Sequence, residues 1–125
     1  MGSNHARRAA LALTVLVGLG AAPVGCGTDD VGPESKMVGG RCTTDGDCVQ
    51  RCLVDAAAFP GGYCTVSCTS NRDCPAGSAC VARERGICLA TCTVAADCED
   101  YGAGYACARQ TSQSTGNGPL ACIGG

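Results

Sequence analysis

Thirteen cysteines, an odd number, constrain this 125-residue chain more than any other feature. Cys26 stands alone behind an apolar N-terminal stretch. The other twelve fall into three groups of four, which are Cys42, Cys48, Cys52 and Cys64, then Cys68, Cys74, Cys80 and Cys88, and finally Cys92, Cys98, Cys107 and Cys122. An even set of cysteines at this density is typical of a disulfide framework. The parity therefore assigns twelve cysteines to disulfides and leaves a separate role for Cys26.

The remainder of the composition also points to cross-links. Residues 41–125 contain only 14 large apolar residues (Val, Leu, Ile, Phe or Tyr) among 85 positions. So few bulky side chains cannot build a large hydrophobic core, and small domains of this kind depend on disulfides. We predict a small disulfide-rich fold of three tandem four-cysteine units with short β-hairpins and little helix outside the signal peptide.

The first 25 residues have the layout of an export signal. Arg7 and Arg8 precede an uncharged apolar run over 9–22, and small residues follow. This run is shorter than the roughly 20 apolar residues that a membrane-spanning helix needs. We expect residues 1–25 to be removed on export and no transmembrane helix to remain.

The end of this leader resembles the lipobox of bacterial lipoprotein precursors, at Val24, Gly25 and Cys26. The resemblance implies cleavage before Cys26 and attachment of a diacylglycerol to its sulfur. Membrane contact would then be through this lipid, in the bacterial cell envelope at the outer membrane or cell surface. The alternative is a plainly secreted protein in which Cys26 is one unpaired thiol.

Residues 26–41 are predicted to be the lipidated cysteine and a flexible tether. The segment holds four Gly and two Asp, with one each of Thr, Pro, Glu and Ser and little to bury, a composition that is typical of disorder. As a random coil it would span about 20 Å, enough to hold a compact domain away from a membrane surface.

The cysteine-rich domain, residues 42–125, repeats an opening motif and a closing motif. Each unit opens Cys-Thr-x-x-x-Asp-Cys, and units one and two close with Gly-x-Cys at Gly62 and Gly86. Such a repeat indicates modules of similar structure. The unit boundaries lie at about 42–67, 68–91 and 92–125.

The stretch between the third and fourth cysteine of each unit predicts a β-hairpin. In unit two, short apolar runs at 79–82 and 87–89 flank turn residues from Arg83 to Gly86. We therefore expect the third and fourth cysteines on paired strands and the opening motif in an irregular loop. Each unit allows three pairings, and we favour first with third and second with fourth, which ties the loop to both strands. Pairing between units stays open.

Two metal sites are weaker interpretations of the same residues. Structural zinc sites often use close Cys-x-x-Cys pairs, which are absent here, and the one histidine, His5, lies in the leader. Calcium needs six to eight oxygen ligands, whereas each unit repeats a single carboxylate. Asp commonly closes a turn by accepting backbone hydrogen bonds. We therefore assign a turn role rather than a metal role to the three repeated residues Asp47, Asp73 and Asp97, and we expect no cofactor.

Catalysis and nucleic-acid binding are not indicated. Without the leader the chain has no histidine, so a Ser-His-Asp or Cys-His arrangement cannot form. The mature chain carries seven basic and eleven acidic residues, a net charge of −4, and therefore no basic patch for phosphates. Hairpin tips remain as candidate contacts for an unknown protein or glycan partner. Phe59, Tyr101 and Tyr105 either contribute to such contacts or cover the small core of their own unit.

The whole chain resembles the cysteine-rich predicted lipoproteins of myxobacteria, through the leader, Cys26 and the repeated motif. Residues 74–80, Cys-Pro-Ala-Gly-Ser-Ala-Cys, are the clearest copy. Unit two also resembles the Asp-Cys-Pro-x-Gly region of whey-acidic-protein and Dickkopf-type modules. The function implied is a non-enzymatic envelope lipoprotein that displays a rigid module. The alternative is a small secreted protease inhibitor with Arg83 or Arg85 on a clamped loop.

Overall fold

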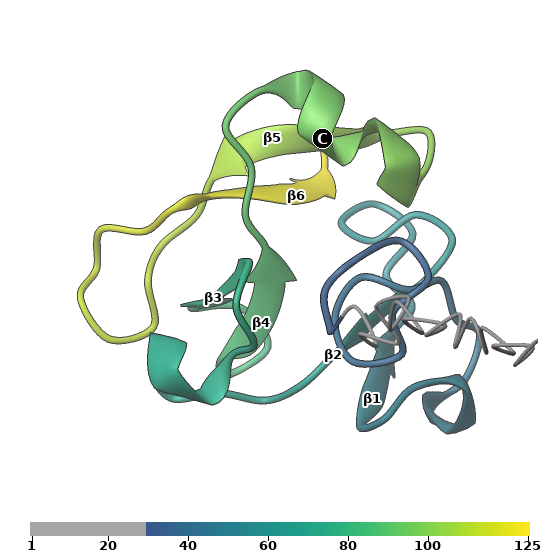
Figure 1. Cartoon of the computed structure of the whole chain (residues 1–125), viewed down its shortest axis with the longest axis horizontal. Helices are drawn as coiled ribbons and strands as arrows, with labels where there is room; N and C mark the ends of the chain where they lie inside the picture. The colour runs from purple at the N-terminus through teal and green to yellow at the C-terminus, as the bar shows by residue number, and fades with distance from the viewer. Residues whose placement is uncertain (1–29) are drawn as a thin grey trace, which may run out of the picture.

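A computed structural model describes residues 30–125, so the predicted export signal and Cys26 lie outside the described residues. Three two-stranded antiparallel hairpins follow one another along the chain, each preceded by a short 3-10 helix (Figure 1). In chain order the elements are η1 (Asp45–Asp47), β1 (Arg51–Leu53), β2 (Tyr63–Thr65), η2 (Asn71–Asp73), β3 (Ser78–Val81), β4 (Ile87–Ala90), η3 (Ala95–Tyr101), β5 (Tyr105–Arg109) and β6 (Leu120–Gly124). The predicted fold class is confirmed, with a 3-10 turn inside each opening segment that we expected to be irregular.

The hairpins place the third and fourth cysteine of each unit directly opposite one another. The opposed pairs are Cys52 with Cys64, Cys80 with Cys88, and Cys107 with Cys122. These opposed cysteines are not bonded to each other. Each is bonded instead to a cysteine of the opening segment, which therefore lies across both strands of its hairpin.

The six disulfides all join the first cysteine of a unit to the third and the second to the fourth. The bonds are Cys42–Cys52, Cys48–Cys64, Cys68–Cys80, Cys74–Cys88, Cys92–Cys107 and Cys98–Cys122. The favoured pairing is confirmed in every unit, and no bond joins two units within residues 30–125. Six covalent bonds and a shared backbone pattern thus give three copies of one small scaffold.

Each hairpin is extended by the chain that enters its unit. In unit two the backbone N–H of Cys88 donates to the carbonyl of Val66, at 3.1 Å. In unit three Thr91 forms an antiparallel bridge with Ala121 of β6. The last strand of one unit therefore continues directly into the entry strand of the next.

Unit one has no preceding unit, and residues 30–41 supply its entry strand. The N–H of Cys64 donates to the carbonyl of Gly40, and the N–H of Gly39 donates to the carbonyl of Cys64, both at 2.8 Å. Val38 is fully buried. The prediction of a flexible tether is therefore wrong for residues 30–41, because the fourth cysteine strand needs a partner that only this segment can provide. Residues 26–29 lie outside the described part.

The three units do not form a straight row, because unit three returns to unit one (Figure 1). The N–H of Gly124, at the end of β6, donates to the carbonyl of Ala58 in unit one, at 2.7 Å. Four aromatic rings fill this junction, with centroids 5.5–6.2 Å apart, and they are Phe59, Tyr63, Tyr101 and Tyr105.

The positions of these rings differ from both predictions for Phe59, Tyr101 and Tyr105, which were partner contacts or a cover for the core of their own unit. Phe59 is 2% exposed, and Tyr101 and Tyr105 are each 9% exposed, so they are not surface contacts. Nor do they cover only their own units, since rings of units one and three pack together. With 14 large apolar residues in the domain, sharing one aromatic cluster between two units buries more area than two separate cores could.

Unit two completes the core through its own strands. Val81, Ile87 and Leu89 are fully buried. The hydroxyl of Thr65 in unit one donates to the carbonyl of Cys88, at 2.7 Å. Every pair of units is therefore in contact, and the domain is one closed body around a small core.

Candidate functional site

The repeated aspartate closes the opening turn of each unit. In unit one, Oδ2 of Asp47 accepts from the N–H of Thr43 (2.9 Å), the hydroxyl of Thr43 (3.1 Å) and the N–H of Thr44 (3.2 Å). The two amide donors and the hydroxyl favour the charged carboxylate and so lower the pKa of Asp47 below its ordinary value. The predicted turn role is confirmed for this residue.

The same three bonds recur in units two and three, and they account for the motif. Asp73 accepts from both donors of Thr69 and from the N–H of Ser70, and its pKa is lowered in the same way. Asp97 accepts from Thr93 and from the N–H of Val94, again with a lowered pKa. The threonine repeats because its hydroxyl is used, whereas the next residue varies because only its backbone donates.

The cysteine clusters resemble metal sites in geometry but not in chemistry. In the described part of the chain, the clusters that bring three ligand atoms within 4.8 Å of one another consist of cysteine sulfurs, one cluster in each unit. All of these sulfurs belong to disulfides. Zinc is bound by thiolates, so the bonded sulfurs serve as cross-links rather than as ligands.

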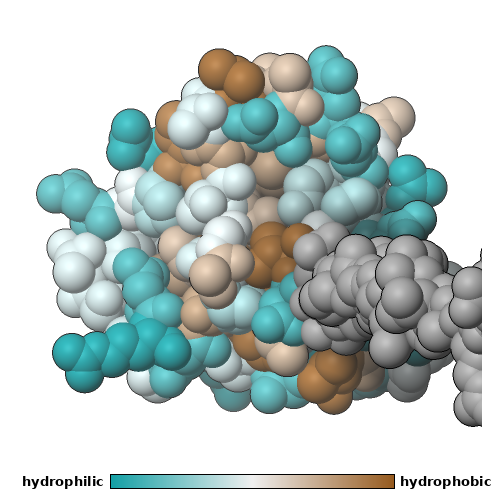
Figure 2. Space-filling model, in the orientation of Figure 1, coloured by the Kyte–Doolittle hydropathy of each residue, from teal (hydrophilic) through white to brown (hydrophobic). Residues whose placement is uncertain are grey.

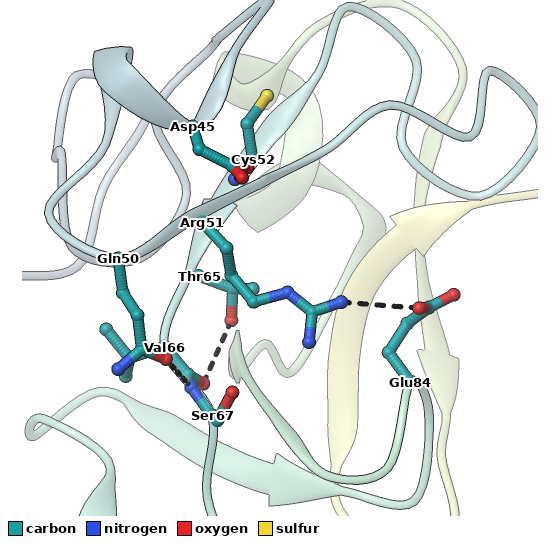
Figure 3. Close-up of polar contacts among 8 residues, drawn as sticks. All are labelled: Asp45, Gln50, Arg51, Cys52, Thr65, Val66, Ser67 and Glu84. Carbon is teal, nitrogen blue, oxygen red and sulfur yellow. Dashed lines mark hydrogen bonds and ion pairs between the residues drawn. The ribbon is translucent and has the colours of Figure 1, made fainter.

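The tip of unit two carries the arginines of the protease-inhibitor alternative. Glu84 and Arg85 have positive φ angles of 49° and 69°, so they form a tight left-handed turn rather than an extended segment. Arg83 donates to the side chain of Gln110 in unit three, at 3.0 Å. Glu84 pairs with Arg51 of unit one, at 3.3 Å (Figure 3). This tip therefore joins the units, and its geometry does not favour an extended inhibitory loop.

Polar side chains near β1 and β2 fix backbone positions within unit one (Figure 3). The side chain of Asp45 accepts from the N–H of Cys52, at 2.9 Å. The side chain of Gln50 accepts from the N–H of Ser67. The side chains of Asp45 and Gln50 are thus used to fix backbone positions.

Two of the hollows on the described surface flank the entry segment, and sequence reasoning missed both. The more polar one, about 790 Å³, is bordered by the charged side chains of Glu34, Lys36, Arg41, Asp47 and Asp100. The more apolar one, about 650 Å³, we call the entry groove, and its lining is Asp30, Gly32, Pro33, Glu34, Ser35, Lys36, Met37 and Val49. Neither hollow could be predicted, because both depend on the packing of a segment with a disordered composition.

The rest of the visible surface offers no large apolar area. Figure 2 shows small apolar patches separated by polar residues on this face. The large apolar side chains that are exposed are Val49, Val54 and Val94, at 65%, 66% and 56%. Val49 is the one of these three that borders the entry groove.

Comparison with protein families, curated proteins and solved structures gives no match for this chain. None of the helices within residues 30–125 has the length and apolar character needed to cross a bilayer. The six disulfides indicate that the protein folds in an oxidising environment.

Proposed function

We propose that this protein is a non-enzymatic lipoprotein of the cell envelope, which displays a rigid disulfide-stapled module for binding or surface structure. The observation that carries the proposal is the complete pairing of the twelve cysteines between residues 42 and 122. None of them is left to pair with Cys26. A thirteenth cysteine directly behind an export signal is then best explained by attachment of a lipid.

The rigidity of the module supports the display role. Each unit is closed by two disulfides, and the units contact one another through backbone hydrogen bonds and the shared aromatic cluster. Such a frame holds exposed loops in one conformation and so reduces the entropy lost when a partner binds. The partner is then a protein or a glycan that contacts these loops.

Intact mass spectrometry of the full-length chain, expressed in a Gram-negative host and extracted from its membranes, tests the lipid. We expect loss of residues 1–25 and an added acyl mass on Cys26. Metabolic labelling with a clickable fatty acid gives a second measurement, with Cys26→Ser as the variant and Gly27→Ser as the matched control. Label should enter the wild type and Gly27→Ser but not Cys26→Ser. Equal labelling of Cys26→Ser would show that the proposal is wrong.

A further inference from the structure

The distance along the chain between Cys26 and the packed domain is short. The carbonyl of Asp30 already accepts from the N–H of Val38, at 3.1 Å, and from the hydroxyl of Ser35, at 2.7 Å. Four residues of fully extended chain span at most about 14 Å. The Cα atom of Cys26 therefore cannot lie more than about 14 Å from that of Asp30, in contrast to the longer separation that a tether through residue 41 would allow.

This limit is about twice the thickness of a headgroup layer. A bilayer is about 40–45 Å thick, of which about 30 Å is hydrocarbon, so each headgroup layer is on the order of 5–8 Å thick. A domain that begins within about 14 Å of the lipid-bearing residue keeps its entry segment close to the bilayer surface. The side chains around Asp30 are therefore the first candidates for a membrane contact.

The side chains at that place suit a lipid surface. Val49 is 65% exposed, and its N–H donates to the carbonyl of Lys36, at 2.8 Å, which fixes it beside the entry segment. Pro33 is exposed and Met37 is half-buried in the same groove. Lys36, the sole lysine of the chain, is exposed there and can pair with a lipid phosphate.

We propose that the entry groove rests on the phospholipid headgroups of the bilayer that anchors Cys26, an inference that depends on the lipidation proposed above. Val49, Pro33 and Met37 enter the headgroup layer, and Lys36 pairs with phosphate. The carboxylates of Asp30 and Glu34 offset the charge of Lys36, so the contact does not require anionic lipid. The lipid on Cys26 holds the groove at a high effective concentration near the surface, so a weak contact is sufficient.

Tryptophan fluorescence tests this orientation, because the chain contains no tryptophan of its own. Val49→Trp places the fluorophore at the entry groove. Asn117→Trp is the matched control, an exposed position in the loop between β5 and β6. That loop lies at the far left of Figure 1, whereas the entry segment lies on the right. Both full-length variants are purified from membranes and reconstituted in phosphatidylcholine vesicles whose acyl chains carry bromine.

We expect the brominated lipid to reduce the emission of Val49→Trp, relative to unbrominated vesicles, and to leave that of Asn117→Trp unchanged. If the brominated lipid removes the same fraction of emission from both variants in acylated protein, the docking proposal is overturned but the lipidation is not. Absence of an acyl mass on Cys26 in the same samples would overturn both. A blue shift of Val49→Trp that grows with protein concentration in the absence of vesicles would assign the groove to a second copy of the chain and overturn the membrane contact.

Discussion

Replacing Tyr63 by phenylalanine tests how units one and two are joined. The hydroxyl of Tyr63 accepts a hydrogen bond from the N–H of Ala90 in β4, at 2.9 Å. Tyr63 is fully buried and Ala90 is 2% exposed. Burial raises the pKa of Tyr63 well above its ordinary value, so the hydroxyl stays neutral. In Tyr63→Phe the N–H of Ala90 loses its acceptor and remains buried, which should cost about 1–3 kcal/mol of unfolding free energy.

Tyr105→Phe makes the same chemical change in the same aromatic cluster with the opposite expectation. The ring centroids of Tyr63 and Tyr105 are 6.2 Å apart. The hydroxyl of Tyr105 is buried without a hydrogen-bond partner in the described part of the chain. Burial raises the pKa of Tyr105 to about 12. Because no hydrogen bond is lost, Tyr105→Phe should leave the stability unchanged or increase it.

Urea unfolding with all disulfides intact, followed by circular dichroism at neutral pH, measures both variants. We expect a lower midpoint for Tyr63→Phe and an equal or higher midpoint for Tyr105→Phe, with the same slope for each. A double variant should show the sum of the two changes if the sites are independent. Equal losses of stability in both single variants would refute the argument, because the cost would then come from removing a buried hydroxyl and not from losing the hydrogen bond.

Three further predictions concern the backbone, the disulfides and the carboxylates. Gly62→Ala should prevent correct folding, because a Cβ there would lie 1.8 Å from the carbonyl oxygen of Cys42. Gly61→Ala has a similar positive φ but nothing within 4 Å of the added Cβ, so it should cost only about 1–2 kcal/mol of unfolding free energy. Disulfide mapping and urea unfolding distinguish the two variants. Removing the Cys98–Cys122 bond by a double alanine substitution should cost about 3.5 kcal/mol of unfolding free energy from loop entropy. This bond closes the longest of the six loops, with a sequence separation of 24, and the shift of the urea midpoint measures the cost. Stability should be constant above pH about 5 and fall progressively toward pH about 2, because the lowered pKa values mean that the folded state binds fewer protons than the unfolded state. When asparagine replaces Asp47, Asp73 and Asp97, the urea midpoint should vary less with pH across this range.

The repeated cysteine spacing predicted three units with the third and fourth cysteines on a hairpin, and it favoured one pairing among the three that each unit allows. The turn residues place the third and fourth cysteines of a unit on opposite strands, and the opening segment is then the nearest source of partners. The same local logic identified Asp47 as a turn residue, since its three donors lie three and four positions away. Interactions that span a few residues leave a pattern that a single sequence displays.

Contacts between distant segments could not be predicted in this way. Val38 lies four residues before Cys42, as Cys64 and Cys88 lie four residues before the first cysteines of units two and three. This spacing is the signal that could have extended the repeat into the supposed tether. No comparable signal identified the aromatic cluster, because the partners of Tyr63 are brought to it only when unit three returns to unit one. The entry groove is lined by the entry segment and Val49, so it too depends on the packing of residues that lie apart in the sequence.

The interleaved bonds also determine what the cell must provide for folding. None of the six disulfides joins cysteines that are consecutive along the chain. If the chain enters an oxidising compartment from its N-terminus, Cys42 meets Cys48 before its native partner Cys52 has emerged. An oxidase that joins thiols in order of arrival therefore makes the wrong bonds in every unit, and these must be exchanged afterwards. If oxidation follows that order, maturation of this protein requires a thiol–disulfide isomerase as well as an oxidant.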